Sequence, residues 1–557
     1  MLSNDGDLDR ALRENERLLR ELRDATEKYE AIRTSLSWKI TGPLRKALDL
    51  LAPRKNHAAG PLLLNNENYR RWIEAYDKLT NADRTAIRTA IDNLKTRPLL
   101  SILVTIKDDP APAILQTIQS IRRQLYPEWE LCLIDTASTA PHVARALASC
   151  GDDPRVRVFR RTNNEPFDIT KGQYIATLDP GDMLAERALF EIAAELDAHP
   201  DTAILYTDED ELDPTGHRIN PRFKTDWNPD LQQDPGKLQF KRAGNEPGPT
   251  RHIPCILCHS AKIAAQTPQQ PPQLPNPAPK VSIIIPTRDR AELLERCIEG
   301  LINRTDYPAI EIIVVDNDSR EAATKQLFTK YPIRVIPYPG EFNWAAMNNA
   351  AAKEATGEIL LFLNNDTDVI SPNWLSELAA QAIRPEIGAV GAKLLFADGT
   401  VQHAGIWLGP AGRVRHLLRL SQRNDPGYLG QLSLTRNLSA VTGACMAIRR
   451  NLFLDVNGFD ESYPVSYNDL DLCLRLREKG HRIVWTPRAE LYHLESASRG
   501  SSEWRWRKEE ADHKRFCAKW QQQMEHDPYF NPNLDLIGEE KLALAFPPRF
   551  KKPWKLD

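Results

Sequence analysis

Short runs of consecutive apolar residues alternate with amphipathic segments along most of this chain. Residues 99–104 read LLSILV and residues 281–285 read VSIII, and each run is followed by a segment with helical spacing. A second apolar run then ends in Asp135 or in Asp316. Such runs are typical of strands buried on both faces of a parallel sheet. The order of strand, helix and strand predicts a βαβ unit in each half, with its ligand site at the carboxyl ends of the strands.

The similar start of both halves predicts an internal repeat in a chain that is too long for one hydrophobic core. We therefore expect an α/β fold with two tandem Rossmann-like domains of mostly parallel sheet. The predicted boundaries are a helical arm at residues 1–60, a first domain at 61–266, a Pro/Gln-rich linker at 267–279, a second domain at 280–500, and a C-terminal helical extension and tail at 501–557.

The predicted N-terminal arm places leucines near helical spacing among dense mixed charges at residues 5–36. Two interpretations stay open. One is a short coiled coil or a helix on the protein's own surface, and the other is a helix that forms oligomers or faces a membrane. The basic and apolar segment at residues 38–51 adds weight to peripheral membrane contact.

Charge and composition narrow the classes of partner and compartment. The 73 basic and 76 acidic residues leave a net charge of −3, so the chain lacks the basic surface that a nucleic-acid partner requires. We find no apolar stretch of about 18 residues and no secretory signal at the polar N-terminus. We therefore expect a cytoplasmic protein, either free or peripheral to the inner face of the cell membrane.

The cysteines lack a repeating spacing, which favours reduced thiols over a disulfide framework. Cys255, Cys258 and His259 match the haem-attachment pattern CxxCH. That attachment requires export, so we expect a buried strand with two ordinary thiols instead.

Acidic side chains follow two apolar strands of the predicted second domain. Asp316 lies at the end of an apolar strand, and two interpretations of its carboxylate stay open. It binds a nucleoside base or ribose, or it simply caps the next helix. Asp366 and Asp368 follow the apolar run at residues 359–363. Two such carboxylates are costly to bury unless a cation neutralises them, and oxygen ligands suit Mg²⁺ or Mn²⁺ on a diphosphate. The alternative is a helix-capping turn before residues 371–374.

A predicted helix at residues 467–477 carries Asp469 and Asp471 in its first turn. Because these two positions face different sides of a helix, we expect one to reach substrate as a general base and the other to be structural. His493 ends a later strand, where it is either a third metal ligand or an ordinary core or surface residue.

Together these motifs resemble the family 2 glycosyltransferases with the GT-A fold, in particular the bacterial tandem-domain enzymes that build cell-surface polysaccharides. The resemblance covers nearly the whole chain. It is carried by VSIIIPTRDR (residues 281–290), IIVVDNDS (312–319), NNDTD (364–368), VTGACMAIRR (441–450), NGFDE (457–461), NDLDLCLRLREKGHRIVWTP (468–487), AELYHLESASRG (489–500), DPYFNPN (527–533) and SLSWKITGPLR (35–45).

The resemblance implies a role for particular residues of the second domain. It assigns nucleotide-sugar binding to Pro286, Thr287, Asp316, Asn349 and Asp366, a divalent metal (Mn²⁺ or Mg²⁺) to Asp366, Asp368 and His493, and base catalysis to Asp469. Gly443 and Ala444 would form the floor beside the acceptor. The family's usual Glu-Asp pair reads Asn468-Asp469 here, which keeps the base and leaves any role of a second carboxylate in doubt.

The implied reaction is one inverting displacement. Asp469 would take the proton of an acceptor hydroxyl as its oxygen attacks the anomeric carbon of a UDP-, dTDP- or GDP-sugar, with the metal neutralising the departing diphosphate. The acceptor would be a glycan or lipid-linked glycan in O-antigen or capsule synthesis, and the group moved a hexose or deoxyhexose. The alternative is a non-catalytic glycan-binding or scaffold partner, against which the clustered carboxylates count.

The first domain follows the same pattern with two defects. Pro180 and Gly181 occupy the middle of its acidic motif, where the family usually has an acid. The acceptor-side half is missing, and no counterpart of Asp469 is present. We therefore expect a degenerate GT-A domain that scaffolds or orients the active one, although nucleotide binding without turnover stays open because Asp135 and Asp179 survive.

Overall fold

The computed structural model describes residues 63–555 except 150, 152, 161–168, 232–235, 245, 262–268, 411, 495–502 and 538–540, and the side chains of 503–507. The predicted N-terminal arm, with its membrane and oligomer interpretations, lies outside the described residues. Residues 269–279 of the predicted linker form neither helix nor strand. The Gln269 side chain donates to the carbonyl oxygens of Leu231, at 2.6 Å, and Thr435, at 2.8 Å.

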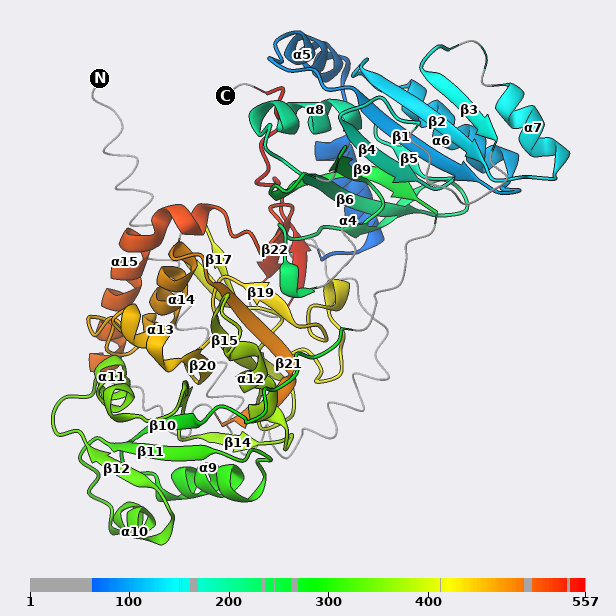
Figure 1. Ribbon diagram of the computed structural model, residues 1–557. Coiled ribbons are helices and arrows are strands. Elements are labelled where there is room, and N and C mark those ends of the chain that lie inside the picture. Colours follow the sequence, from blue (N-terminus) through cyan, green and yellow to red (C-terminus); the bar gives the residue numbers. More distant parts are fainter. Residues whose placement is uncertain are drawn as a thin grey trace, which may run out of the picture. The chain divides into compact units, whose positions relative to one another are not determined.

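The first repeat is an α/β layer built on one mixed sheet (Figure 1). Its strand order is β3-β2-β1-β4-β8-β6-β9-β5, with β7 paired to β6. The elements are α4 (Asn66–Trp72), η1 (Ile73–Asp77), α5 (Asn81–Asp92), β1 (Leu100–Ile106), α6 (Ala111–Arg122), β2 (Trp129–Asp135), α7 (Pro141–Ala148), β3 (Val156–Arg160), β4 (Tyr174–Leu178), β5 (Met183–Leu184), α8 (Ala188–Ala198), β6 (Ile204–Leu212), β7 (Arg218–Arg222), η2 (Pro229–Leu231), β8 (Gln239–Arg242) and β9 (Thr250–Ser260).

The second repeat has the same strand order, β12-β11-β10-β13-β20-β15-β21-β14, with β16 paired to β15 and β19 to β21. Strands β10 to β13 are mutually parallel, and β20 enters the sheet antiparallel to β13. The elements are β10 (Val281–Thr287), α9 (Ala291–Asn303), β11 (Ile310–Asp316), α10 (Ala322–Lys330), β12 (Arg334–Pro337), α11 (Trp344–Glu354), β13 (Ile359–Leu363), β14 (Thr367–Val369), α12 (Trp374–Ala382), β15 (Ile387–Leu395), β16 (Val401–His403), β17 (Ile406–Gly409), β18 (Arg413–His416), η3 (Tyr428–Gly430), β19 (Arg436–Leu438), β20 (Cys445–Arg449), α13 (Arg450–Asp455), α14 (Asn468–Glu478) and β21 (Arg482–His493). The C-terminal elements are α15 (Glu503–Glu525), β22 (Leu534–Ile537) and β23 (Lys541–Leu544).

The apolar strands of the second repeat are buried on both faces, as their composition predicts. Ile283 and Leu361 point into a core shared with α9 and α12, whereas their neighbours Ile284 and Phe362 point into a core shared with α11, α14 and α15. This alternation follows from the two-residue period of a strand. Figure 1 shows α9 and α10 on one side of β10 to β12, and α11, α13 and α14 on the other.

A buried hydrogen-bond motif occurs at the same place in both repeats. Ser101 in β1 accepts from the Gly172 amide at 2.9 Å, and Ser282 in β10 accepts from the Gly357 amide at 2.8 Å. A Cβ at Gly172 would lie 2.5 Å from the Leu99 carbonyl oxygen, and one at Gly357 would lie 2.6 Å from the Ser282 nitrogen. The predicted duplication is therefore present down to this contact.

The repeats differ where the sequence predicts a defect. In the second repeat, residues 450–481 connect β20 to β21 and carry α13 and α14, whereas in the first repeat only residues 243–249 connect the corresponding β8 to β9. The described part of the first repeat therefore has no helix in the place of α14. It keeps the sheet and lacks the element that carries Asp469.

The DPYFNPN segment joins the two repeats, which belong to one unit at residues 62–557. Asp527 accepts from the Leu408 amide at 2.9 Å and the Ser439 hydroxyl at 2.6 Å, both in the second repeat. Asn531 donates to Asp208 of the first repeat at 2.8 Å. This segment therefore has a structural role that its sequence alone does not reveal.

Asp208 also holds a buried histidine of the first repeat. His252 lies between Asp208, 2.9 Å from Nε2, and Asp226, 3.2 Å from Nδ1. Burial alone lowers the pKa of His252, but the two carboxylates outweigh it and raise the pKa to about 9. Both ring nitrogens therefore carry protons at neutral pH.

The described cysteines are all free thiols, and Cys255 and Cys258 are buried in β9. Among the residues that the structure describes, no helix has both the length and the apolarity to cross a bilayer.

Candidate active site

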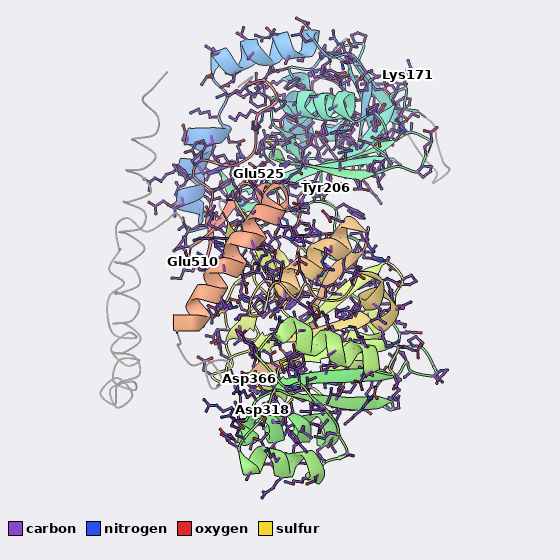
Figure 2. All side chains as sticks on the ribbon, turned by 90° about the vertical axis from the view of Figure 1, so that its left-hand side faces the viewer. Lys171, Tyr206, Asp318, Asp366, Glu510 and Glu525 are labelled. Atoms are coloured by element: carbon purple, nitrogen blue, oxygen red, sulfur yellow. The ribbon has the colours of Figure 1, made fainter. Side chains whose placement is uncertain are left out.

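The carboxyl ends of β10, β11 and β13 bring a row of polar side chains to one edge of the second sheet. Thr287 and Asp316 are paired residues at the ends of the parallel strands β10 and β11. The Thr287 hydroxyl accepts from the side-chain Nδ2 of Asn365 at 3.0 Å, and Asp366 is the next residue in the chain. Figure 2 shows Asp366 and the exposed Asp318 on the same side of the second repeat. The topology thus brings Thr287, Asp316 and Asp366 to the same edge of the sheet.

Asp366 meets His493 at the end of this row. Both side chains are buried, and Asp366 Oδ1 lies 3.1 Å from His493 Nε2. They come from segments far apart in sequence, which meet because β14 and β21 are antiparallel and Thr367 pairs with His493.

Gln402 in β16 fixes the tautomer of His493. The Gln402 Nε2 donates to the His493 carbonyl oxygen at 3.2 Å, and because that carbonyl can only accept, the Gln402 Oε1 must face the ring. His493 Nδ1 therefore donates to Gln402 Oε1 at 2.7 Å. In the neutral ring this leaves a lone pair on Nε2, which lies 3.1 Å from Asp366 Oδ1 and 3.2 Å from the Asn364 side-chain nitrogen.

The Asn364 side-chain amide can donate to the lone pair on His493 Nε2 at 3.2 Å, and a proton or a metal ion between Nε2 and the Asp366 carboxylate would remove the repulsion between those two groups. One carboxylate and one imidazole fit Mn²⁺ better than Mg²⁺, which prefers oxygen ligands alone. The described residues contain no cluster of three or more His, Cys, Asp or Glu side chains able to hold a metal. Asp366 and His493 could supply two ligands to a divalent cation.

Asp368 does not join Asp366 and His493, in contrast to the prediction from the DxD resemblance. Its Oδ2 accepts from Arg296 at 2.7 Å, and its Oδ1 forms an ion pair with Arg304, both from α9. A divalent cation would have to displace two guanidinium groups to reach this carboxylate. The position instead fastens β14 to α9.

Asp469 stands in the first turn of α14, partly exposed. One carboxylate oxygen accepts from the Gly443 amide at 2.7 Å, and the other accepts from its neighbour Leu470 at 2.9 Å. Burial raises the pKa of Asp469, while the backbone amides that bond it act in the opposite direction. A carboxylate held this way is a stronger base than an ordinary surface aspartate.

Asp471 has a different environment, although it lies only two residues away. It is fully buried, and it pairs with Arg475 and with Lys519 of α15, each at 2.7 Å. The Trp520 indole donates to the same carboxylate at 3.0 Å. Asp471 therefore fastens α14 to α15, whereas Asp469 has no cationic partner among the described residues.

The segment Gly443-Ala444 connects the two halves of the candidate site. The Ala444 carbonyl oxygen accepts from the Asn364 amide at 3.0 Å on the side of Asp366, and the Gly443 amide holds Asp469 on the other. A Cβ at Gly443 would lie 2.7 Å from the Trp344 ring and 3.4 Å from the Cβ of Asp469. Only glycine fits here, so the base, the indole and the strand end that carries Asp366 lie side by side.

Asn349 has a structural role that differs from the predicted one. Its Oδ1 accepts from the Phe459 amide at 2.9 Å, and its Nδ2 donates to the Phe459 carbonyl oxygen at 2.8 Å. These bonds use both ends of the amide to hold the NGFDE segment against α11. Pro286 is buried within β10, opposite Val315.

Two residues of β16 were not predicted. Gln402 orients His493, and the buried His403 accepts from the Thr442 amide at 3.3 Å, next to the segment that holds Asp469. Burial holds the pKa of His403 well below its ordinary value, so the ring is neutral and able to accept. The only signal in the sequence is a polar Gln-His pair inside an apolar stretch.

Comparison with known proteins assigns both repeats to the same family. The family model described as glycosyl transferase family 2 matches residues 101–255 and 282–456. An uncharacterized protein of Sinorhizobium fredii is 37% identical over 560 residues, which cover 84% of this chain and 61% of that protein. An O-antigen biosynthesis protein of Myxococcus xanthus is 35% identical over 553 residues, which cover 85% of this chain and 43% of that protein. The chain spans about half the length of these curated relatives.

Among solved structures, a mannosyltransferase of Pyrobaculum calidifontis in complex with GDP-Man and Mn²⁺ aligns with a TM-score of 0.33 at 19% identity. The alignment covers 47% of this chain and 71% of that chain.

Proposed function

Because the chain belongs to glycosyl transferase family 2, we propose that its second repeat moves a sugar from a nucleoside-diphosphate sugar to a saccharide hydroxyl, with inversion, in the synthesis of a surface polysaccharide. The observation that carries this proposal is the placement of Asp366 with His493 on one side of Gly443-Ala444 and of Asp469 on the other. Similarity to the O-antigen biosynthesis protein supports the polysaccharide context.

Asp316 and Thr287 line the nucleoside end of the proposed donor site. Paired at the ends of β11 and β10, they present a carboxylate and a hydroxyl where open α/β sheets bind ligands. The donor is a UDP-, dTDP- or GDP-sugar carrying a hexose or deoxyhexose.

Asp366 and His493 hold the proposed divalent cation, Mn²⁺ in preference to Mg²⁺. When bound, the ion neutralises charge that develops on the departing diphosphate. Gln402 keeps the His493 lone pair on the side of Asp366. Asp368 contributes by holding β14, which follows Asp366 directly, against α9.

Asp469 is the proposed general base. It accepts the proton of the acceptor hydroxyl as that oxygen forms its bond to the anomeric carbon and the bond to the diphosphate breaks. The Gly443 amide fixes the orientation of the carboxylate, and burial raises its pKa, which strengthens it as a base. A purely scaffolding protein has no need for such a carboxylate without a cationic partner.

The first repeat is the proposed scaffold, since its described part has no helix in the place of α14. Its Asp179 pairs with Lys237 at 2.5 Å. The cytoplasmic face of the membrane, where lipid-linked glycan acceptors would be met, is the proposed site of action.

Release of nucleoside diphosphate from a panel of UDP-, dTDP- and GDP-sugars tests the proposal. The wild-type chain with Mn²⁺ and a mixture of oligosaccharide acceptors releases one nucleotide, and Asp366→Ala, His493→Ala or chelator abolishes release. Full release in the presence of chelator would refute the metal role. Wild-type transfer by Asp469→Asn would show that catalysis lies elsewhere, including in the first repeat.

A further inference from the structure

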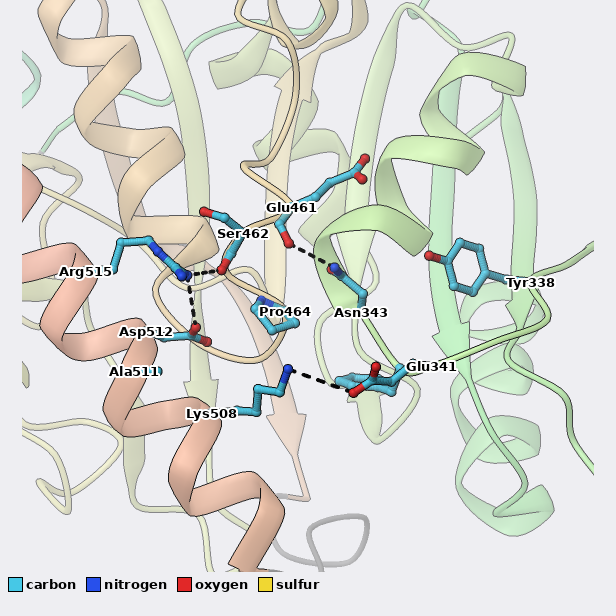
Figure 3. Close-up of a pocket in the computed structure, with 11 residues that line it drawn as sticks. Tyr338, Glu341, Asn343, Glu461, Ser462, Pro464, Lys508, Ala511, Asp512 and Arg515 are labelled. Carbon is cyan, nitrogen blue, oxygen red and sulfur yellow. Dashed lines mark hydrogen bonds and ion pairs between the residues drawn. The ribbon is translucent and has the colours of Figure 1, made fainter.

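A pocket of about 490 Å³ opens in the second half of the chain. It lies between the loop that leads into α11, the segment at residues 461–464, and helix α15 (Figure 3). Its volume is within the range of roughly 300–1,000 Å³ typical of small-molecule sites.

The walls of this pocket continue directly into the residues around Asp469. Asn343 lines the pocket and precedes Trp344, whose ring lies against Gly443. The Trp344 amide donates to the Pro464 carbonyl oxygen at 2.9 Å. Asp512 of α15 accepts from the Ser466 amide at 3.1 Å, three residues before the base. These contacts link the pocket walls to the segments that position Asp469, and Gly443-Ala444 lies between the base and the strand end that carries Asp366.

The charges that line the pocket favour an uncharged ligand. Glu341, Glu461 and Asp512 supply carboxylates, and Lys508 and Arg515 supply cations. Figure 3 shows the cations paired within the pocket, with Lys508 at 3.9 Å from Glu341 and Arg515 at 3.7 Å from Asp512. A phosphate or nucleotide would meet more negative than positive charge here.

The remaining lining suits a sugar ring. Phe342 and Pro464 present apolar surface beside hydrogen-bonding groups such as the Tyr338 hydroxyl and the Glu461 carboxylate. Carboxylates and hydroxyls accept from sugar hydroxyls, and apolar rings cover the carbon-bound hydrogens of the sugar. Glu341 and Lys508 are exposed at 70% and 42%, so the pocket is open to solvent on one side. An open pocket allows a longer saccharide to continue outward.

We propose that this pocket binds a neutral mono- or disaccharide portion of the acceptor, adjoining the hydroxyl that Asp469 deprotonates. This inference rests on the proposed function and adds the acceptor subsite and its ligand class. Helix α15, from the C-terminal extension, supplies one wall. The specificity for the acceptor therefore depends on residues outside the second βαβ unit and its sheet.

Filling the pocket without removing a hydrogen bond tests this assignment. Ala511 of α15 is exposed and lines the pocket, so Ala511→Trp places an indole in it. Ala518→Trp adds the same side chain two turns along, at an exposed position outside the lining. Saturation-transfer NMR of the full chain, without metal, uses methyl glycosides and methyl disaccharides of hexoses and 6-deoxyhexoses as probes.

We expect at least one probe to bind the wild type, to bind Ala511→Trp at least tenfold more weakly, and to bind Ala518→Trp within twofold of the wild type. Equal binding by both variants, or no binding of any probe to the wild type, overturns the proposal. Titration of the same proteins with UDP, dTDP and GDP plus Mn²⁺ separates the two ideas. If a nucleotide binds but the saccharide results contradict the expectation, only the pocket assignment is wrong. If no nucleotide binds, the proposed donor site is wrong.

Discussion

Asp469→Asn is the substitution that most clearly separates chemistry from structure in this protein. It removes the proton acceptor and keeps the shape of the side chain. General-base catalysis contributes about 10²- to 10⁴-fold, so we expect kcat to fall by this factor, equivalent to about 3–5 kcal/mol in activation free energy. Both Asp469 oxygens accept backbone N–H groups, and an asparagine oxygen can replace only one of them. The free energy of unfolding should therefore fall by only about 1 kcal/mol.

Asp471→Asn is the matched control, two residues along the same helix. Asp471 is fully buried between Arg475, Lys519 and the Trp520 indole. Removing its charge leaves two cations without their partner and should lower the free energy of unfolding by about 3 kcal/mol. Its kcat should stay within threefold of the wild type at a temperature where the variant is folded.

The assay is nucleotide release under saturating donor and Mn²⁺, combined with denaturant unfolding of both variants and calorimetric titration with nucleoside diphosphate. We expect Asp469→Asn to bind nucleotide like the wild type and to turn over at least a hundredfold more slowly. If Asp469→Asn keeps more than a tenth of the wild-type kcat, or if Asp471→Asn is the slower enzyme when folded, the assignment of the base is wrong.

Three further predictions follow from the contacts of single side chains. Asp368→Asn should keep Mn²⁺-dependent nucleotide binding, measured by calorimetry, because its carboxylate is held by arginines; a loss as large as that of Asp366→Asn would show that both ligate the ion. Gln402→Leu should weaken Mn²⁺ affinity about 10- to 100-fold, as loss of a partner that orients a metal ligand does. ¹⁵N NMR of this variant should show a mixture of His493 tautomers, and a single unchanged tautomer would contradict the role of Gln402. The pKa of His252 is raised to about 9 from the ordinary 6.5, so the stabilisation by protonated His252 is complete below pH 6.5. It is lost as pH rises through 9, by roughly 3 kcal/mol. Urea unfolding between pH 6 and 10 should show this loss in the wild type and not in His252→Gln, and parallel curves for the two proteins would refute the prediction.

The sequence predicts the fold and the edge of the site well because both depend on local patterns. Apolar runs that end in acid place Asp316 after β11 and Asp366 after β13, and the parallel pairing of both strands with β10 brings the two residues to the same edge of the sheet. The strand ends require only strand periodicity. The missing counterpart of Asp469 was inferred by comparison with the family pattern, since the connection in the first repeat is too short to hold a helix.

The partners of the acidic residues could not be predicted, because they come from distant segments. In the sequence Asp368 resembles a metal ligand, but in the structure two arginines of α9 pair with its carboxylate. Asn349 resembles a nucleotide ligand, but its side-chain amide bonds to the backbone of Phe459. Gln402 gains its role only through the pairing of β15 with β16 and β21. Tertiary contacts of this kind leave no periodic trace in the sequence.

Calorimetric titration of the purified chain with UDP, dTDP and GDP, each with Mn²⁺ and with chelator, tests the central claim most directly. We predict that one nucleotide binds only with Mn²⁺, and that Asp366→Ala and His493→Ala each abolish this binding while Asp135→Ala in the first repeat leaves it unchanged. Binding that is indifferent to metal, or that survives loss of both Asp366 and His493, would contradict a metal-dependent donor site in the second repeat.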